Sequence, residues 1–292
     1  MHHSRLAFLV ALFVSGAQVT FAQLKIACIG DSITEGSGLG NPAVESYPPR
    51  LQRLLGTNYI VRNFGVGGRT LLKEGDFPYW REPVFKQSKD WDPDIVIIQL
   101  GTNDSKPQNW KFGTNFVSEY EEFITNYTGL KSAPWVVLCT PCPVYANGAY
   151  GITPSIVTTN IAPMVRDLAN RMGLELVDLR TRLDGHKEWF PDTVHPNSKG
   201  MVVMSAIMYD ALLGGRPSGS PPEITITHPS KTQVALTWPA AWGNLVPQYT
   251  LSLRTNTTWS VLELPTAYGD GELIHQTNSV GSSTRLYRLW QP

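Results

Sequence analysis

The stretch Ile29-Gly30-Asp31-Ser32-Ile33-Thr34-Glu35-Gly36 follows an apolar run, Leu24 to Ile29, that is typical of a buried β-strand. Small and polar residues then break the apolar pattern, which indicates a turn from a strand into a helix. A serine on such a turn lies at the open end of a sheet, beside the free N–H groups that begin the next helix. Ser32 is therefore the first candidate nucleophile, although a serine at a turn is equally typical of a helix cap.

Apolar runs alternate with segments of helical pattern from this stretch to residue 213. The expected strands are 24–29, 59–64, 95–100, 135–139 and 174–177, and the expected helices are 46–55, 114–127, 155–172 and 198–213. Continuous apolar strands separated by helices predict an α/β fold whose parallel sheet is covered on both faces. Ligands of such folds bind at the carboxyl ends of the strands.

The pattern changes after residues 214–222, a stretch of Gly, Pro, Ser and one Arg that predicts a linker. Short segments beyond it alternate apolar and polar residues, which predicts a small β-sandwich domain over 223–292. Its Trp238, Trp242 and Trp259 could bind carbohydrate, but we favour a core role for them.

The N-terminus resembles a secretory signal peptide. Basic residues precede the apolar run Leu6 to Val14, and small residues end at Ala22, where cleavage is expected. We therefore expect a signal peptide at 1–22 and a secreted or periplasmic protein without a membrane anchor. An uncleaved membrane tether is the alternative.

Charge and cysteine content exclude several classes of function. Lys and Arg total 24, as do Asp and Glu, and no segment clusters basic residues. Nucleic acid is therefore not expected as a partner. Cys139 and Cys142 form a single Cys-x-x-Cys pair, too few thiols for a four-cysteine zinc site, so a structural role is favoured whether or not they are oxidised.

Three further motifs follow predicted strands and so lie at the same edge of the sheet. Residues 63–70 include Gly65, Gly67 and Gly68, 101–104 read Gly-Thr-Asn-Asp, and 192–197 contain an Asp-x-x-His pair. Glycines let a backbone N–H approach a ligand, and an asparagine amide adds a neutral donor. An aspartate three residues before a histidine can orient the imidazole to take a proton from a serine. Each motif alone is also typical of an ordinary turn.

Together, in this order, the four motifs resemble the four sequence blocks of the SGNH (GDSL-like) hydrolase superfamily, over residues 24–213. The resemblance implies a three-layer, flavodoxin-like fold with a five-stranded parallel sheet. It also implies a nucleophile, Ser32, whose acid and base partners are Asp192 and His195. The N–H groups of Ser32 and Gly68 and the side chain of Asn103 would form the oxyanion hole, with Gly67 as the alternative glycine.

The implied chemistry is two-step acyl transfer from an ester through the serine, which needs no cofactor and no metal. Segments 63–80 and 100–110 resemble exported bacterial carbohydrate acetylesterases of the sialate O-acetylesterase and acetylxylan esterase type. An acetylated glycan is thus the expected substrate. The expected substrate contacts are Asp31, Tyr79, Trp80 and Trp110, whose aromatic members could form a stacking wall for a sugar ring.

Two other functions stay open. One is a lipase or thioesterase that uses the same three residues, and the other is a catalytically idle glycan-binding protein. The intact Ser32, Asn103, Asp192 and His195 argue against the idle protein. The C-terminal domain is expected to bind carbohydrate or to self-associate, if it binds anything.

Overall fold

The computed structural model describes residues 23–213, 224–230, 233–239, 245–251, 259–262, 268–269, 273–279 and 285–290. The predicted signal peptide, 1–22, and the predicted linker, 214–222, lie outside the described residues.

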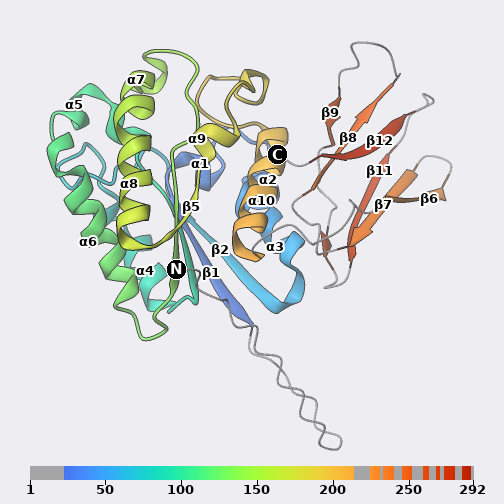
Figure 1. Cartoon of the computed structure of the whole chain (residues 1–292), viewed down its shortest axis with the longest axis horizontal. Coiled ribbons are helices and arrows are strands. Elements are labelled where there is room, and N and C mark those ends of the chain that lie inside the picture. The colour runs from blue at the N-terminus through green and yellow to red at the C-terminus, as the bar shows by residue number, and fades with distance from the viewer. Residues whose placement is uncertain are drawn as a thin grey trace, which may run out of the picture.

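A parallel sheet forms the centre of the α/β part (Figure 1). Its strands are β1 (Leu24–Gly30), β2 (Tyr59–Gly65), β3 (Ile95–Gln99), β4 (Trp135–Cys139) and β5 (Glu175–Val177). They lie in the order β2-β1-β3-β4-β5, and each neighbouring pair is parallel. The predicted five-stranded parallel sheet is thus confirmed. The strand order reverses between β1 and β3, which is where folds of this topology bind ligands.

Helices cover both faces of this sheet. Two of them, α3 (Tyr47–Leu55) and α10 (Ser198–Leu213), cover one face, and α4 (Pro83–Asp90), α6 (Phe116–Thr128) and α8 (Ala162–Met172) cover the other (Figure 1). Alternate residues of each strand point to opposite faces. Accordingly Ile26 and Cys28 of β1 belong to the core under α3 and α10, while Ala27 and Ile29 belong to the core under the other three helices.

The expected helix 155–172 is interrupted. It comprises α7 (Pro154–Ile156), a π-helical turn (Val157–Ile161) and α8. Pro163 near the start of α8 has no N–H to donate to an earlier carbonyl, which accounts for the changed hydrogen-bond spacing. Within the described residues, no helix has the length and apolarity needed to cross a bilayer.

Short helices complete the α/β part. They are α1 (Ser32–Glu35), α2 (Pro42–Glu45), α5 (Pro107–Trp110) and α9 (Leu179–Arg182), with 3-10 turns at Gly56–Asn58, Tyr79–Arg81, Asn103–Ser105, Gly113–Asn115, Ala149–Gly151 and Lys187–Trp189.

The three cysteines are free thiols, and all are buried. Cys139 Sγ lies 3.9 Å from Met208 Sδ, and Cys142 Sγ lies 4.0 Å from Met204 Sδ, so both side chains pack against α10. This agrees with the structural role favoured from the sequence.

The C-terminal part consists of antiparallel strands in two sheets, as expected for a small β unit. One sheet has the order β10-β11-β7-β6 and the other β12-β8-β9. The strands are β6 (Thr225–Ser230), β7 (Gln233–Pro239), β8 (Val246–Thr250), β9 (Ser260–Val261), β10 (Tyr268–Gly269), β11 (Leu273–Ser279) and β12 (Leu286–Trp290).

The tryptophans of this β unit differ in burial. Trp238 is 1% exposed, which confirms its core role. Trp259 is partly buried, and the Arg288 guanidinium lies over its ring at 4.3 Å. Trp242 lies outside the described residues.

Helix α10 is buried along most of its length, from Gly200 to Tyr209 and again at Leu212. A helix that is apolar on all sides must be covered on all sides. The sheet covers one side of α10, and the β unit lies beyond it (Figure 1). Strand β8 contacts α10, and β10 contacts α3. Buried residues of the two parts form one continuous cluster, which includes Trp238 of β7 and Met208 of α10.

A shared core predicts that damage to the β unit destabilises the α/β part. We expect Trp238→Ala to lower the free energy of unfolding by about 3–5 kcal/mol, because it removes a large buried side chain. The test is urea unfolding followed by the far-ultraviolet circular dichroism of the helices, which belong to the α/β part. Leu251→Ala, at a side chain that is 62% exposed, is the matched control. An unchanged helical midpoint in Trp238→Ala would show that the two parts unfold independently.

Candidate active site

A cavity of about 440 Å³ opens at the carboxyl edge of the sheet. Its walls bring together segments that are far apart in the sequence, and they include Ser32, Gly67, Gly68, Asn103, Lys106, Tyr150, Ile152, Asp192, Val194 and His195. All four sequence motifs therefore meet at one cavity.

The turn that carries Ser32 is built by its neighbours. Asp31 caps α1, because its carboxylate accepts a hydrogen bond of 2.9 Å from the Ile33 N–H. Glycine at position 30 lets β1 and β3 pack closely, because a Cβ there would lie 2.7 Å from the Gln99 carbonyl oxygen of β3. Gly36 ends the helix with φ +96°, a conformation that favours glycine. Ser32 thus stands at the first position of a helix fixed at both ends.

Ser32, His195 and Asp192 form one chain of hydrogen bonds. Ser32 Oγ lies 2.8 Å from His195 Nε2, and His195 Nδ1 lies 2.7 Å from Asp192 Oδ2. The Asp-x-x-His segment is a tight turn in which Asp192 Oδ1 also accepts from the Val194 and His195 N–H groups at 3.0 and 2.7 Å. Such an arrangement can move a proton from a serine hydroxyl to an imidazole and stabilise the resulting imidazolium.

The Asp192 carboxyl stays ionised over a wide pH range. Burial alone would raise its pKa, but the hydrogen bonds from the His195 and Val194 N–H groups and from the His195 ring outweigh burial and lower the pKa from 3.8 to about 2. A negative charge is therefore present beside the imidazole at neutral pH.

Candidate oxyanion donors surround Ser32. Gly68 has φ +79°, a conformation that favours glycine, and its backbone lines the cavity beside Ser32. Asn103 Nδ2 donates to the Arg69 carbonyl oxygen at 3.2 Å and lies 3.5 Å from Asp31 Oδ2. The contact with Asp31 is the longer and weaker of the two hydrogen bonds. Gly67 also lines the cavity, and both glycines stay candidates.

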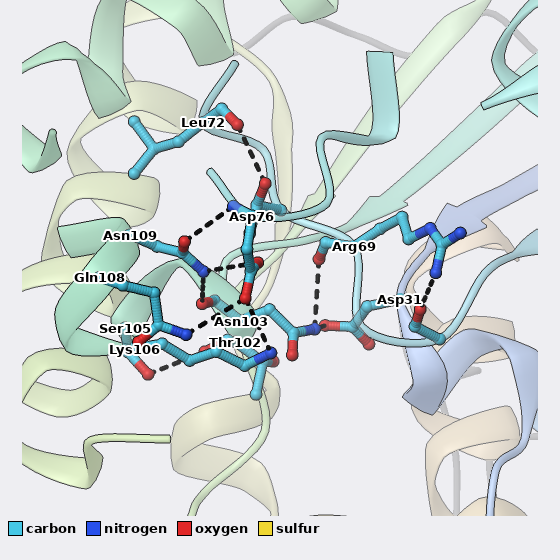
Figure 2. A network of polar contacts seen from close by, with 12 residues as sticks. Asp31, Arg69, Leu72, Asp76, Thr102, Asn103, Ser105, Lys106, Gln108 and Asn109 are labelled. Carbon is cyan, nitrogen blue, oxygen red and sulfur yellow. Dashed lines mark hydrogen bonds and ion pairs between the residues drawn. The ribbon is translucent and has the colours of Figure 1, made fainter. Parts of the chain in front are cut away.

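A second layer of polar residues holds Asn103 in place (Figure 2). Asn109 is fully buried, and its Nδ2 donates both to the Asn103 carbonyl oxygen and to Asp76 Oδ1, each at 2.9 Å. Its Oδ1 accepts from the Asp76 N–H at 2.9 Å, and Gln108 Nε2 donates to Asp76 Oδ2 at 3.2 Å. These bonds tie the loop of Asn103 to the loop of Arg69, whose carbonyl orients the Asn103 amide.

Two buried carboxyls lie under the cavity floor. Asp31 and Asp104 are both 0% exposed, and Asp104 accepts from the Leu71 and Leu72 N–H groups at 3.1 and 2.7 Å. Burial raises the pKa of Asp31 to about 6 and that of Asp104 to about 7. Asp31 is not among the residues that line the cavity, and its carboxylate caps α1; its contact with substrate stays a prediction.

The three aromatic residues expected to contact substrate pack against other rings, and Tyr79 has no exposed surface with which to contact a sugar. Tyr79 is fully buried, and its hydroxyl donates to the Phe64 carbonyl oxygen at 2.6 Å. Trp80 packs edge-on against Phe123, with its Nε1 bonded to the Leu71 carbonyl, and Trp110 packs against Phe116. None of the three lines the cavity. Tyr79 belongs to the core beneath α6, and the partly buried Trp80 and Trp110 pack against that core.

Two cavity residues were missed from the sequence. Lys106 contributes a cation that lies 3.7 Å from Asp76 Oδ2, and Tyr150 lies between Gly148 and Gly151 in a loop without a strand or helix pattern. The Tyr150 hydroxyl donates to Asp192 Oδ2 at 3.0 Å.

Among the described residues, no group of three or more His, Cys, Asp or Glu side chains is placed to hold a metal ion.

Residues 28–203 match the GDSL-like Lipase/Acylhydrolase family. The chain belongs to this family. A curated relative, "Acetylxylan esterase" of Xylanibacter ruminicola, is 38% identical over 208 residues, which cover 65% of this chain and 43% of the relative. The chain thus spans less than half the length of this relative.

Solved structures share the fold of the family at low identity. Est24, described as a carbohydrate acetylesterase from Sinorhizobium meliloti, superposes with a TM-score of 0.54 at 19% identity over 66% of this chain and all of that chain. The acetyl xylan esterase AlAXEase superposes with a TM-score of 0.52 at 23% identity over 65% of this chain and all of that chain. These neighbours and the strand order confirm the predicted flavodoxin-like fold.

The buried carboxyls predict that the free energy of unfolding falls between about pH 4 and pH 7. Folded Asp31 and Asp104 keep their protons to about pH 6 and 7, whereas the unfolded chain releases them near pH 4. The folded state binds more protons in this window, so each group lowers stability by at most about 1.4 kcal/mol per pH unit as the pH rises. The lowered pKa of Asp192 changes the free energy of unfolding only below about pH 4, outside this range. Urea unfolding over this range measures the slope, and a free energy that rises with pH would contradict the buried pair.

Proposed function

We propose that the chain is a serine esterase that removes O-acetyl groups from a carbohydrate by two-step acyl transfer. The observation that carries this proposal is the continuous hydrogen-bond chain from Ser32 through His195 to Asp192, which ends in an open cavity. Membership of an acylhydrolase family supports the same reaction class.

In the first step His195 takes the Ser32 proton as Oγ attacks the acetyl carbonyl carbon. The tetrahedral intermediate carries its negative charge on the former carbonyl oxygen, near the Ser32 and Gly68 N–H groups and the Asn103 amide. The intermediate then collapses: the bond from the carbonyl carbon to the sugar oxygen breaks, and that oxygen takes the proton from His195 and leaves as a hydroxyl. In the second step His195 takes a proton from a water as the water attacks the acetyl-serine carbonyl carbon. The bond from that carbon to Ser32 Oγ then breaks, Oγ recovers its proton from His195, and acetate leaves.

An acetyl group on a glycan is the substrate that the lining supports best. The aliphatic side chains on the cavity wall are those of Ile152 and Val194, and both are almost fully buried. The remaining lining side chains are polar, aromatic or absent, which suits a small acyl group and a hydroxyl-rich leaving group. The name of the Xylanibacter relative points to the same substrate class.

The predicted signal peptide at 1–22 fits this function, because polymeric glycans are met outside the cytoplasm. We accordingly propose a secreted or periplasmic enzyme. A lipase or thioesterase remains the second candidate, since the same three side chains would serve it.

Removing the nucleophile is expected to abolish hydrolysis. Ser32→Ala should lower kcat for p-nitrophenyl acetate by at least about 10³-fold, and Asn103→Ala by about 10²–10³-fold through the loss of one oxyanion donor. Ser37→Ala is the matched control, because Ser37 lines the same cavity and its hydroxyl bonds only Glu35 among the described contacts. Activity that survives in Ser32→Ala would mean that another group is the nucleophile.

Acyl-chain preference separates the two candidate functions. We expect kcat/KM to fall from p-nitrophenyl acetate to butyrate to octanoate, and acetylated xylan to release acetate. Octanoate as the best substrate would transfer the assignment to the lipid class.

A further inference from the structure

Tyr150 touches two members of the hydrogen-bonded chain from the cavity side. Its hydroxyl donates to Asp192 Oδ2 at 3.0 Å, the same oxygen that His195 Nδ1 contacts at 2.7 Å. Its ring lies 5.0 Å from the His195 ring at an interplanar angle of 77°. The side chain is 62% exposed, which is unusual for a tyrosine with such specific contacts.

The backbone at this position is strained. Tyr150 has φ +53° and ψ +21°, the left-handed region that bulky residues avoid. The non-glycine residues with positive φ in the described part of the chain are Asp92, Ala133, Tyr150 and Thr193. Two of these adjoin Asp192, since Thr193 (φ +74°) follows it directly and Tyr150 bonds its carboxylate. Strain of this kind persists where the surroundings over-determine a conformation, and it gathers at functional sites.

The surroundings of Tyr150 do fix its loop. The Gly148 N–H donates to the Ile152 carbonyl at 3.0 Å, which closes the turn, and the Thr153 N–H donates to Ser105 Oγ at 3.2 Å. On the other side the Tyr145 N–H donates to the Thr193 carbonyl at 2.9 Å. The loop is thereby tied to the segment that carries Asp192 and His195.

We propose that Tyr150 is a positioning residue for the Asp192–His195 pair, acting from the substrate side of the cavity. The inference rests on the proposed esterase function. Asp192 Oδ1 is held by two backbone N–H groups, and Oδ2 is held by His195 and by Tyr150. The hydroxyl stops the carboxylate from turning toward water, and the ring covers one side of His195. The imidazole is therefore held at the angle that Ser32 needs.

Three variants test this role against a merely structural one. Tyr150→Phe removes only the hydroxyl, and we expect kcat for p-nitrophenyl acetate to fall about tenfold with KM within about twofold and Tm unchanged. Tyr150→Gly removes the side chain and relieves the backbone, so kcat should fall at least as far while Tm stays within about 2 °C of wild type. Ala133→Gly is the matched control, because it relieves a positive φ in the turn before β4, and its kcat should equal that of wild type.

The outcomes are distinct. Wild-type kcat in Tyr150→Phe would overturn the proposal, and so would a loss of kcat that is matched by a fall in Tm in both Tyr150 variants, since that shows a folding role. A wild-type protein without esterase activity would instead overturn the proposed function, and Tyr150 would then have no pair to position.

Discussion

The hydrogen bond between Ser32 Oγ and His195 Nε2 is the contact on which the rest of the site depends, and it joins residues 163 positions apart. It forms only because β1 ends and α10 begins at the same edge of the sheet. The parallel arrangement of β1 and β3 and the cover of α10 over that face set this meeting point. A sheet of the same strands with another order would separate the hydroxyl from the imidazole.

Several groups near this hydrogen bond lower the stability of the folded state. Asp31 and Asp104 are buried carboxyls whose pKa values are raised by desolvation, and Thr193 combines a positive φ with a buried hydroxyl that has no hydrogen-bond partner in the structure. Groups of this kind are costly in an ordinary core. Here they lie around Asn103, Ser32 and Asp192, so the destabilising groups are concentrated at the candidate active site. The compensating stability lies in the two layers of helices and in the β unit that covers α10.

Sequence reasoning found the features that depend on short-range pattern. Continuous apolar runs gave all five strands of the parallel sheet to within one residue at either end, and the spacing of the four motifs located Ser32, Asn103, Asp192 and His195 at one cavity. It failed where a side chain could serve either the core or the site. Tyr79 and Trp80 pack against the rings of Phe85 on α4 and Phe123 on α6, and no local sequence pattern predicts these contacts. Tyr150 and Asn109 could not be found, since their roles come from contacts with Asp192 and Asp76, which lie 42 and 33 positions away in the sequence.

The central claim is that Ser32 is the attacking atom of an acyl-transfer site. The most direct measurement is the mapping of a covalent adduct: the protein is treated with diethyl p-nitrophenyl phosphate, digested and analysed by mass spectrometry. We expect one diethyl phosphoryl group on Ser32, formed in parallel with the loss of esterase activity, and no modification of Ser37 in the same cavity. An inactivated enzyme that carries the group on a different residue, with Ser32 unmodified, would contradict it.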